Sequence, residues 1–300
     1  MRTYKLLQVD AFTDKLFGGN PAAVVFNAES LSDIEMKQIT REMNLSETAF
    51  ILPSEIGNFC LRYFTPSGNE IKFCGHATVG ALHAIASENE FGITKAGTYP
   101  LKVETNSGLM DMLVDYKKEN EISIQFNSPE IDLVIDKYSH EVNGEALGID
   151  IQLIDKSVPV MRDRTNNYVY LKVKSLKDLE RINYDVKKAY DFAFKDGTII
   201  FCIMVNETFD KKNQIHSRCF APLVGVSEDP ATGSAQGALA AYALLNKLIS
   251  ENGEIIGLEQ GHFINRPSQI NVKLIKEKEK FKATVFARAI SVFKAELKIN

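Results

Sequence analysis

The chain has 300 residues, of which 45% are apolar and 25% charged, and its formal net charge is −4. This is an ordinary globular composition, long enough for one large domain or two of usual size. The slightly acidic balance predicts no electrostatic preference for nucleic acid. No apolar run approaches the roughly 20 residues that cross a bilayer, and the N-terminus has no signal-peptide pattern. We therefore expect a cytoplasmic protein that binds neither nucleic acid nor membranes.

Short segments rich in β-branched and aromatic residues predict a strand-rich fold. Asn106-Ser-Gly108 looks like a hairpin loop between Leu101–Thr105 and Leu109–Val114. The other predicted strands, in chain order, are Tyr4–Phe12, Ala22–Phe26, Thr48–Leu52, Cys60–Thr65, Glu121–Phe126, Asn167–Val173, Thr198–Val205, Gln269–Leu274 and Phe281–Phe286.

One amphipathic helix has a clear start. Ser32 is suited to cap it, Glu35 to close the capping box, and Leu31 and Met36 to form a hydrophobic staple. This pattern predicts a helix that runs to about Asn44.

Two further segments, Ala77–Ser87 and Ala235–Leu248, are small and apolar on nearly every face. A helix without a polar face is usually buried all round. The pattern predicts an α+β protein with two curved, mostly antiparallel sheets, each wrapped around its own central helix.

The segments before and within these helices repeat. Phe-x-Pro, Gly-x-Ala and Gly-Ala-Leu occur in the same order in both parts of the chain, offset by 156 to 158 residues. Such a repeat indicates an ancient duplication into two pseudo-symmetric halves. We place the boundary in the polar stretch near 115–121, which gives an N-terminal half of residues 1–118 and a C-terminal half of residues 119–287. A C-terminal strand at about 288–300 would complete the first half.

In each repeat a loop ends at a glycine, Gly75 or Gly233, just ahead of the buried helix. A helix N-terminus offers unpaired N–H groups and a partial positive charge, and glycine lets a ligand approach them closely. Two such termini facing one cleft would hold a small carboxylate. The alternative is that both turns serve only packing.

Polar residues flank these turns. His76 and Ser234 follow the glycines, and Asp229 precedes the second helix; a helix cap and ordinary loop chemistry are the alternative roles. Glu47 lies directly ahead of the apolar run Thr48–Leu52. At the mouth of an apolar core its carboxyl would have a raised pKa, as proton exchange near neutral pH requires. Alternatively, Glu47 lies at a strand edge and faces water.

Several other chemistries lack their motifs. Gly75 and Gly80 resemble half a P-loop, but Ala81-Leu82 follows where Lys and Ser or Thr are needed. There is neither a G-x-G-x-x-G nor a G-x-S-x-G motif. The five histidines show no metal-ligand spacing, and the four cysteines show no C-x-x-C, so neither a zinc site nor a disulfide framework is predicted.

Taken together, a series of short motifs resembles the PhzF family of phenazine-biosynthesis isomerases. The motifs fall in the family's order, span about residues 8 to 268, and are specific only jointly. They are Gln8–Phe12 with Gly19–Ala22, Asn44–Thr48, Arg62–Pro66, Phe73–Thr78, Arg218–Pro222, Glu228–Ala235, and Glu259–Gly261 with Arg266–Ser268.

This resemblance implies the diaminopimelate epimerase-like fold, with an active site between two halves. It also implies an isomerase that moves a proton on a small carboxylate-bearing substrate, needs neither metal nor organic cofactor, and often forms homodimers. The residues that match the family's functional positions are Glu47 as general acid/base, His76, Asp229 and Ser234 as the rest of the catalytic site, and Ser46, Gly75 and Gly233 as substrate-binding residues.

One departure separates this chain from the racemases of the same fold, which use two cysteines. Here the two positions hold Cys74 and Thr232. A hydroxyl without a lowered pKa does not replace a thiolate as base, so a single carboxylate is the better candidate. A non-catalytic small-molecule binding or regulatory protein is the alternative function, and a metal-dependent hydrolase is disfavoured. The sequence does not name the substrate.

Overall fold

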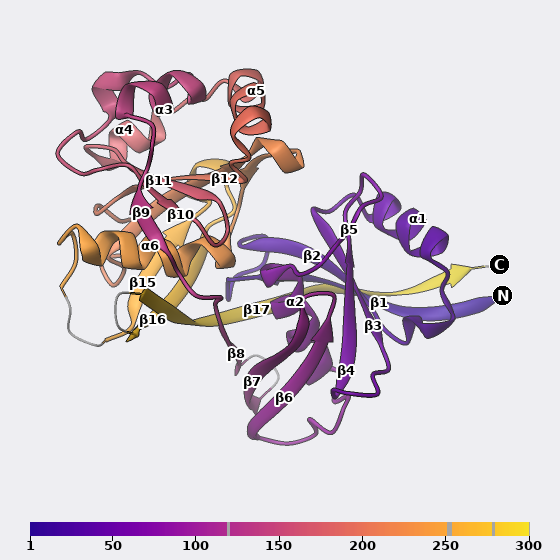
Figure 1. The fold of residues 1–300 in the computed structure, drawn as a ribbon. Coiled ribbons are helices and arrows are strands. Elements are labelled where there is room, and N and C mark those ends of the chain that lie inside the picture. The colour runs from indigo at the N-terminus through magenta and orange to yellow at the C-terminus, as the bar shows by residue number, and fades with distance from the viewer. Residues whose placement is uncertain (119–120, 251–253, 278–279, 300) are drawn as a thin grey trace. The chain divides into compact units, whose positions relative to one another are not determined.

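The computed structural model describes residues 1–118, 121–250, 254–277 and 280–299 (Figure 1). It divides into two compact units, and each is described by itself. Unit 1 comprises Met1–Phe126 and Phe286–Asn300, and unit 2 comprises Asn127–Val285. The boundary predicted after residue 118 adjoins residues 119–120, which lie outside the described residues.

Unit 1 is built on a mostly antiparallel sheet. Strand β1 pairs with β17 on one side and β2 on the other, and pairing continues through β3, β4, β6 and β7 to β8, which also pairs with β17. The β2–β3 and β4–β6 pairs are parallel. The strands are β1 Arg2–Ala11, β2 Asn20–Val25, β3 Glu47–Leu52, β4 Phe59–Phe64, β5 Glu70–Ile71, β6 Gly97–Thr105, β7 Gly108–Lys118, β8 Glu121–Asn127 and β17 Lys280–Ile299, which continues from unit 2.

Two helices belong to unit 1, α1 (Asp33–Met43) and α2 (Gly75–Ser87), with a short 3-10 turn η1 (Ala28–Ser30). The predicted capping box of α1 is confirmed, since Ser32 Oγ accepts from the Glu35 N–H and the Glu35 carboxylate accepts from the Ser32 N–H. Helix α2 is buried from His76 to Ala86 and packs against β1, β2 and β3, as its apolar sequence predicts.

Unit 2 also has a central buried helix, α6 (Gly233–Leu245), which packs on β9, β11, β12 and β16. The β11–β12 and β13–β15 pairs are parallel, and the other strand pairs with a given register are antiparallel. The strands are β9 Leu133–Ile135, β10 Met161–Asp163, β11 Tyr168–Lys172, β12 Ile200–Val205, β13 Ile215–Ala221, β14 Val226–Asp229, β15 Ile256–Gln260 and β16 Ser268–Glu277.

Three short helices, which the sequence analysis did not predict, cover the other face of this sheet (Figure 1). Because side chains alternate along a strand, Val169 and Phe201 pack under these helices, whereas Tyr170 reaches α6, where its hydroxyl donates to the Ala235 carbonyl. The helices are α3 His140–Leu147, α4 Leu176–Glu180 and α5 Val186–Asp196; the 3-10 turns of unit 2 are η2 Ile151–Leu153, η3 Pro222–Val224 and η4 His262–Ile264.

All the predicted strands and the predicted hairpin are present, with ends shifted by a few residues. The last predicted strand, Phe281–Phe286, is part of the much longer β17. The sequence analysis also missed β5, β9, β10 and β13 to β15. Among the described residues, no helix is long and apolar enough to cross a membrane.

The repeated Gly-Ala-Leu motifs place one glycine inside each buried helix, and their surroundings differ. A Cβ on Gly237 would lie 2.8 Å from Ala283 Cβ, too close without movement. A Cβ on Gly80 would meet Ala22 Cβ at 3.5 Å, an ordinary contact. Helix α6 therefore packs directly on β17 at a point where no side chain fits.

This difference yields a matched test. Gly237→Ala should lower the free energy of unfolding by about 1–3 kcal/mol, as overpacked cores do. Gly80→Ala should be neutral or stabilising by up to about 1 kcal/mol, because alanine favours helix. Urea unfolding followed by circular dichroism measures both, and equal losses in the two variants would contradict the packing argument.

Candidate active site

Four polar residues of unit 1 lie together where α2 begins. Glu47 is the first residue of β3 and Ser46 precedes it, while Cys74 and His76 flank Gly75, the first residue of α2. The local sequence explains the placement. Helix α2 is apolar along most of its length, His76 lies in its first turn, and β3 begins beside that end.

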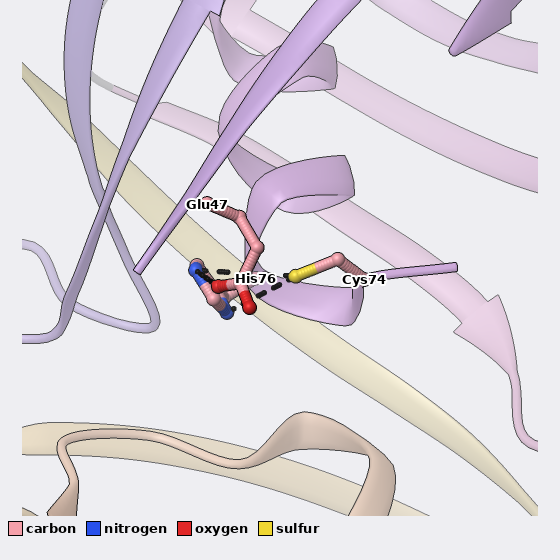
Figure 2. A group of neighbouring side chains, drawn as sticks. All are labelled: Glu47, Cys74 and His76. Atoms are coloured by element: carbon pink, nitrogen blue, oxygen red, sulfur yellow. Dashed lines mark hydrogen bonds and ion pairs between the residues drawn. The ribbon is translucent and has the colours of Figure 1, made fainter. Parts of the chain in front are cut away.

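The side chains of Glu47 and Cys74 both approach the imidazole of His76 (Figure 2). His76 Nε2 lies 3.1 Å from Glu47 Oε2 and 3.1 Å from Ser46 Oγ. Cys74 Sγ lies 3.4 Å from His76 Nδ1. The side chains of His76 and Glu47 are only 8% and 13% exposed, so Glu47 does not face water at a strand edge.

The electrostatics differ from the prediction. Burial of Glu47 raises the pKa of its carboxyl, but the contact with His76 and the hydrogen bond from Ser46 outweigh burial and leave the pKa below its ordinary value. The predicted raised pKa is therefore wrong. The physical reason is a cationic neighbour, His76, which lies 29 residues further along the chain.

The pKa values of Cys74 and His76 are both raised, which keeps the thiol neutral and the imidazole charged. Burial raises the pKa of the Cys74 thiol, which therefore stays neutral near pH 7. Burial alone would lower the pKa of His76, but Cys74 and Glu47 beside it raise that pKa well above its usual value. Since the thiol is neutral, the Glu47 carboxylate is the negative charge that keeps His76 protonated.

One oxygen of the carboxylate retains bonding capacity. Glu47 Oε2 is buried and makes no well-aligned hydrogen bond, although it lies at ion-pair distance from His76. A buried acceptor of this kind is costly to leave unsatisfied. The cluster thus presents an ionised carboxylate with an oxygen able to accept a proton.

The remaining predicted site residues belong to unit 2. Asp229 ends β14, and Gly233 and Ser234 begin α6. The Thr232 hydroxyl donates to Asp229 Oδ2 at 2.5 Å, and Ser234 Oγ lies 3.2 Å from the Tyr168 hydroxyl. Because these residues and Glu47 lie in different units, the expectation that they share one cleft stays a prediction.

The sequence analysis missed residues that support these turns. Gln260 is fully buried, and its amide N–H groups donate to the Asp229 carbonyl at 2.6 Å and to Thr232 Oγ1 at 3.0 Å. Tyr168 was not singled out either. The signal for Gln260 was its place in the Glu-Gln-Gly motif, which carried the resemblance but no assigned role.

Two groups of described side chains offer ligand atoms for a metal ion, each group within 4.8 Å, although the sequence shows no metal-ligand spacing. One is Glu47, Cys74 and His76; the other is His216, Glu259 and His262. In the first group the neutral thiol and the protonated imidazole are not in their metal-binding forms. The arrangement of Glu47, Cys74 and His76 suits proton transfer better than metal binding.

Comparison with solved structures supports the epimerase-like fold. A Bacillus anthracis phenazine biosynthesis protein of the PhzF family is similar over all of both chains, with a TM-score of 0.88 and 29% identity. A hydroxyproline epimerase of Agrobacterium vitis shares the fold at 11% identity, with a TM-score of 0.60 over 99% of this chain and 91% of that one.

Sequence relatives point to the same group. The chain is 36% identical to an uncharacterised isomerase of Clostridium acetobutylicum, over the full length of both. It is 30% identical to the trans-2,3-dihydro-3-hydroxyanthranilate isomerase of Pseudomonas aeruginosa, covering 89% of each chain. The model of the phenazine biosynthesis-like protein family matches residues 9–295. The chain therefore belongs to the phenazine biosynthesis-like (PhzC-PhzF) family, a family of isomerases.

Proposed function

We propose that this chain isomerises a small carboxylate-bearing molecule by moving one proton, with the Glu47 carboxylate as the single acid/base and with no metal or organic cofactor in the reaction. The observation that supports it is the ionised, mostly buried Glu47, whose Oε2 lies 3.1 Å from His76 and makes no well-aligned hydrogen bond.

The proposed reaction needs no electron donor or acceptor. Glu47 accepts a proton from one carbon of the substrate, and the C–H electron pair moves into the neighbouring double-bond system. The same carboxyl then returns the proton to another carbon, which restores the carboxylate. His76, cationic beside Glu47, stabilises the negative charge that develops on the substrate.

The substrate class follows from two considerations. The backbone N–H groups at the start of α2 and the cationic His76 favour an anion near Glu47. The Pseudomonas aeruginosa relative is named for an anthranilate derivative, which carries a carboxylate. We propose that Ser46 and Gly75 contact the substrate carboxylate. We also propose that Asp229, Ser234 and Gly233 complete the site and that the protein is a homodimer, as the family resemblance implies.

Replacing the proposed acid/base tests the proposal directly. Glu47→Gln keeps the size of the side chain but removes its ability to take up a proton, so kcat should fall by about 10²- to 10⁴-fold. Turnover of a carboxylate substrate identified by screening is the measurement, and Glu42→Gln, an exposed carboxylate in α1, is the matched control. A Glu47→Gln protein with near-native kcat would refute the assigned role.

The pH dependence tests the charge state of the pair. The lowered pKa of Glu47 keeps it ionised until the pH falls below 4.5, and the raised pKa of His76 keeps it cationic until the pH rises well above 6.5. The kcat/KM of the free enzyme should therefore stay level above roughly pH 5 and fall on the alkaline side only at a pH well above 6.5. An acid limb centred near pH 6 or 7, with circular dichroism showing a folded protein, would contradict this assignment.

A variant in unit 2 tests the roles that the resemblance implies. Asp229→Asn retains an oxygen to accept the hydrogen bond from Thr232 while removing the charge. If Asp229 acts on the substrate, kcat/KM should fall by at least about tenfold. Asp210→Asn, an exposed aspartate of the same unit, is the control. Equal activity of the two variants would remove Asp229 from the site.

A further inference from the structure

Two free cysteines of unit 2 lie opposite each other in the sheet. Cys202 on β12 and Cys219 on β13 are register partners in an antiparallel strand pair. The side chains of such partners point to the same face of the sheet, and their Cα atoms are roughly 4.5–5.5 Å apart. Both side chains are fully buried, and Cys219 Sγ lies 3.1 Å from Cys202 Sγ. The proposed reaction uses neither thiol.

Both thiols belong to the layer between this sheet and α6. Tyr170, the register partner of Cys202 on β11, extends its hydroxyl to α6. Phe201 and Phe220, which adjoin the two cysteines along their strands, pack on the opposite face under the short helices. Since side chains alternate along a strand, the two cysteines share the face of Tyr170. Close packing on this face holds the two sulfur atoms against each other.

The geometry of the pair meets the requirements of a disulfide bond. A disulfide joins cysteines whose Cα atoms are about 4.4–6.8 Å apart, with the sulfur atoms about 2.05 Å apart. Opposed residues of an antiparallel pair satisfy the first requirement. Sulfur shifts that total about 1 Å satisfy the second, so the bond forms without a change in the strand register. Buried cysteines often serve only as small apolar side chains, but that role does not require two sulfur atoms in contact.

A small oxidant has a route to Cys219. On the side of β13 away from Cys202, the register partner of Cys219 is Asp229 on β14. Asp229 and the following Pro230 are partly exposed, and the Thr232 hydroxyl contacts the Cys219 thiol. Local opening of this turn admits a molecule as small as a hydroperoxide. Cys202 lies one strand further from the turn, so Cys219 is the first thiol that the oxidant reaches.

We propose that Cys202 and Cys219 form a reversible oxidation site, which closes to an intramolecular disulfide when the protein is exposed to a hydroperoxide. With hydrogen peroxide, the Cys219 sulfur attacks one oxygen, an S–O bond forms, the O–O bond breaks, and the thiol proton leaves with the other oxygen as water. The Cys202 sulfur then displaces the bound oxygen, which takes the second thiol proton and leaves as water. The two thiols are oxidised to one disulfide, and the peroxide is reduced to water.

The two steps differ in rate. Burial and the adjacent Cys202 thiol raise the pKa of Cys219 well above its usual value, so this thiol is neutral near pH 7 and attacks peroxide slowly. The second step joins sulfur atoms that are already in contact, and it is therefore fast. The site responds to sustained rather than brief exposure to peroxide. It lies beside Asp229, but it rests on no part of the proposed function.

Peptide mapping of the full-length, folded protein tests this site. After exposure to millimolar hydrogen peroxide, the remaining thiols are alkylated and the protein is digested with trypsin, which cleaves after Lys212 and Arg218, between the two cysteines. A disulfide-linked pair of peptides that contain Cys202 and Cys219 should accumulate over hours and disappear on addition of dithiothreitol. Its formation should be roughly tenfold faster at pH 8 than at pH 7, because the thiolate fraction rises with pH.

Variants test the order of the two steps. Dimedone, which traps sulfenic acids, should label Cys219 in peroxide-treated Cys202→Ser, because that variant lacks the thiol that closes the disulfide. Cys60→Ser, which removes a partly exposed thiol of unit 1, is the matched control and should form the Cys202–Cys219 link as the wild type does. Circular dichroism checks that each variant is folded, and mapping of the wild type decides if Cys202→Ser is not.

Three outcomes would overturn the proposal. The first is a folded wild type in which both thiols remain open to alkylation in urea after prolonged exposure to peroxide. The second is a set of mixed links to Cys60 or Cys74 in place of one defined link. The third is a folded Cys202→Ser protein in which peroxide and dimedone leave Cys219 unlabelled.

Discussion

The contact between the Glu47 carboxylate and the His76 imidazole is the interaction on which the candidate active site depends. A mostly buried carboxylate is costly unless an opposite charge lies beside it, and removal of one partner leaves the other charge uncompensated. His76 supplies that charge at 3.1 Å, and Ser46 and Cys74 contact its ring from either end. The residues at positions 46, 74 and 76 therefore act as one electrostatic unit around Glu47.

The rest of unit 1 holds this cluster of side chains in place. Helix α2 is enclosed by strands along its length, and the buried Tyr63 hydroxyl bonds Thr78 Oγ1 at 2.6 Å one turn inside the helix. The N-terminal end of α2 thus has little freedom to move.

In unit 2 different residues hold the start of the buried helix. Buried Gln260 and the hydrogen bond between Thr232 and Asp229 fix the turn at which α6 begins. A thiol is absent from that turn, and burial keeps Cys74 protonated, so the Glu47 carboxylate is the group among these that is ready to accept a proton near pH 7.

The sequence was most informative where the signal is local. Ser32 and Glu35 mark the start of α1, and the apolar sequences of α2 and α6 indicate that these helices are buried. Each signal lies within a few residues of its effect. Helices α3 to α5 were missed although capping residues mark their starts, at Ser139, Ser175 and Asp185. They are short, and packing on Val169 and Phe201 stabilises them. Glu47 was found by its place before an apolar strand and by the family motif, but the sign of its pKa shift depends on His76, a contact that only the tertiary structure provides. The grouping of His216 with Glu259 likewise depends on the register of two parallel strands 43 residues apart.

The lowered pKa of Glu47 raises a mechanistic question, because a strongly ionised carboxylate is a weak base. On the proposed function, binding of the substrate compensates for the weak basicity of Glu47. An anionic substrate placed beside Glu47 and His76 raises the pKa of both groups and excludes water, which strengthens the carboxylate as a base only in the complex. In the free protein the ion pair keeps Glu47 in the deprotonated form that begins the reaction. A carboxylate-bearing substrate then contributes to catalysis through its own charge, and a neutral analogue of the same shape would lack that effect.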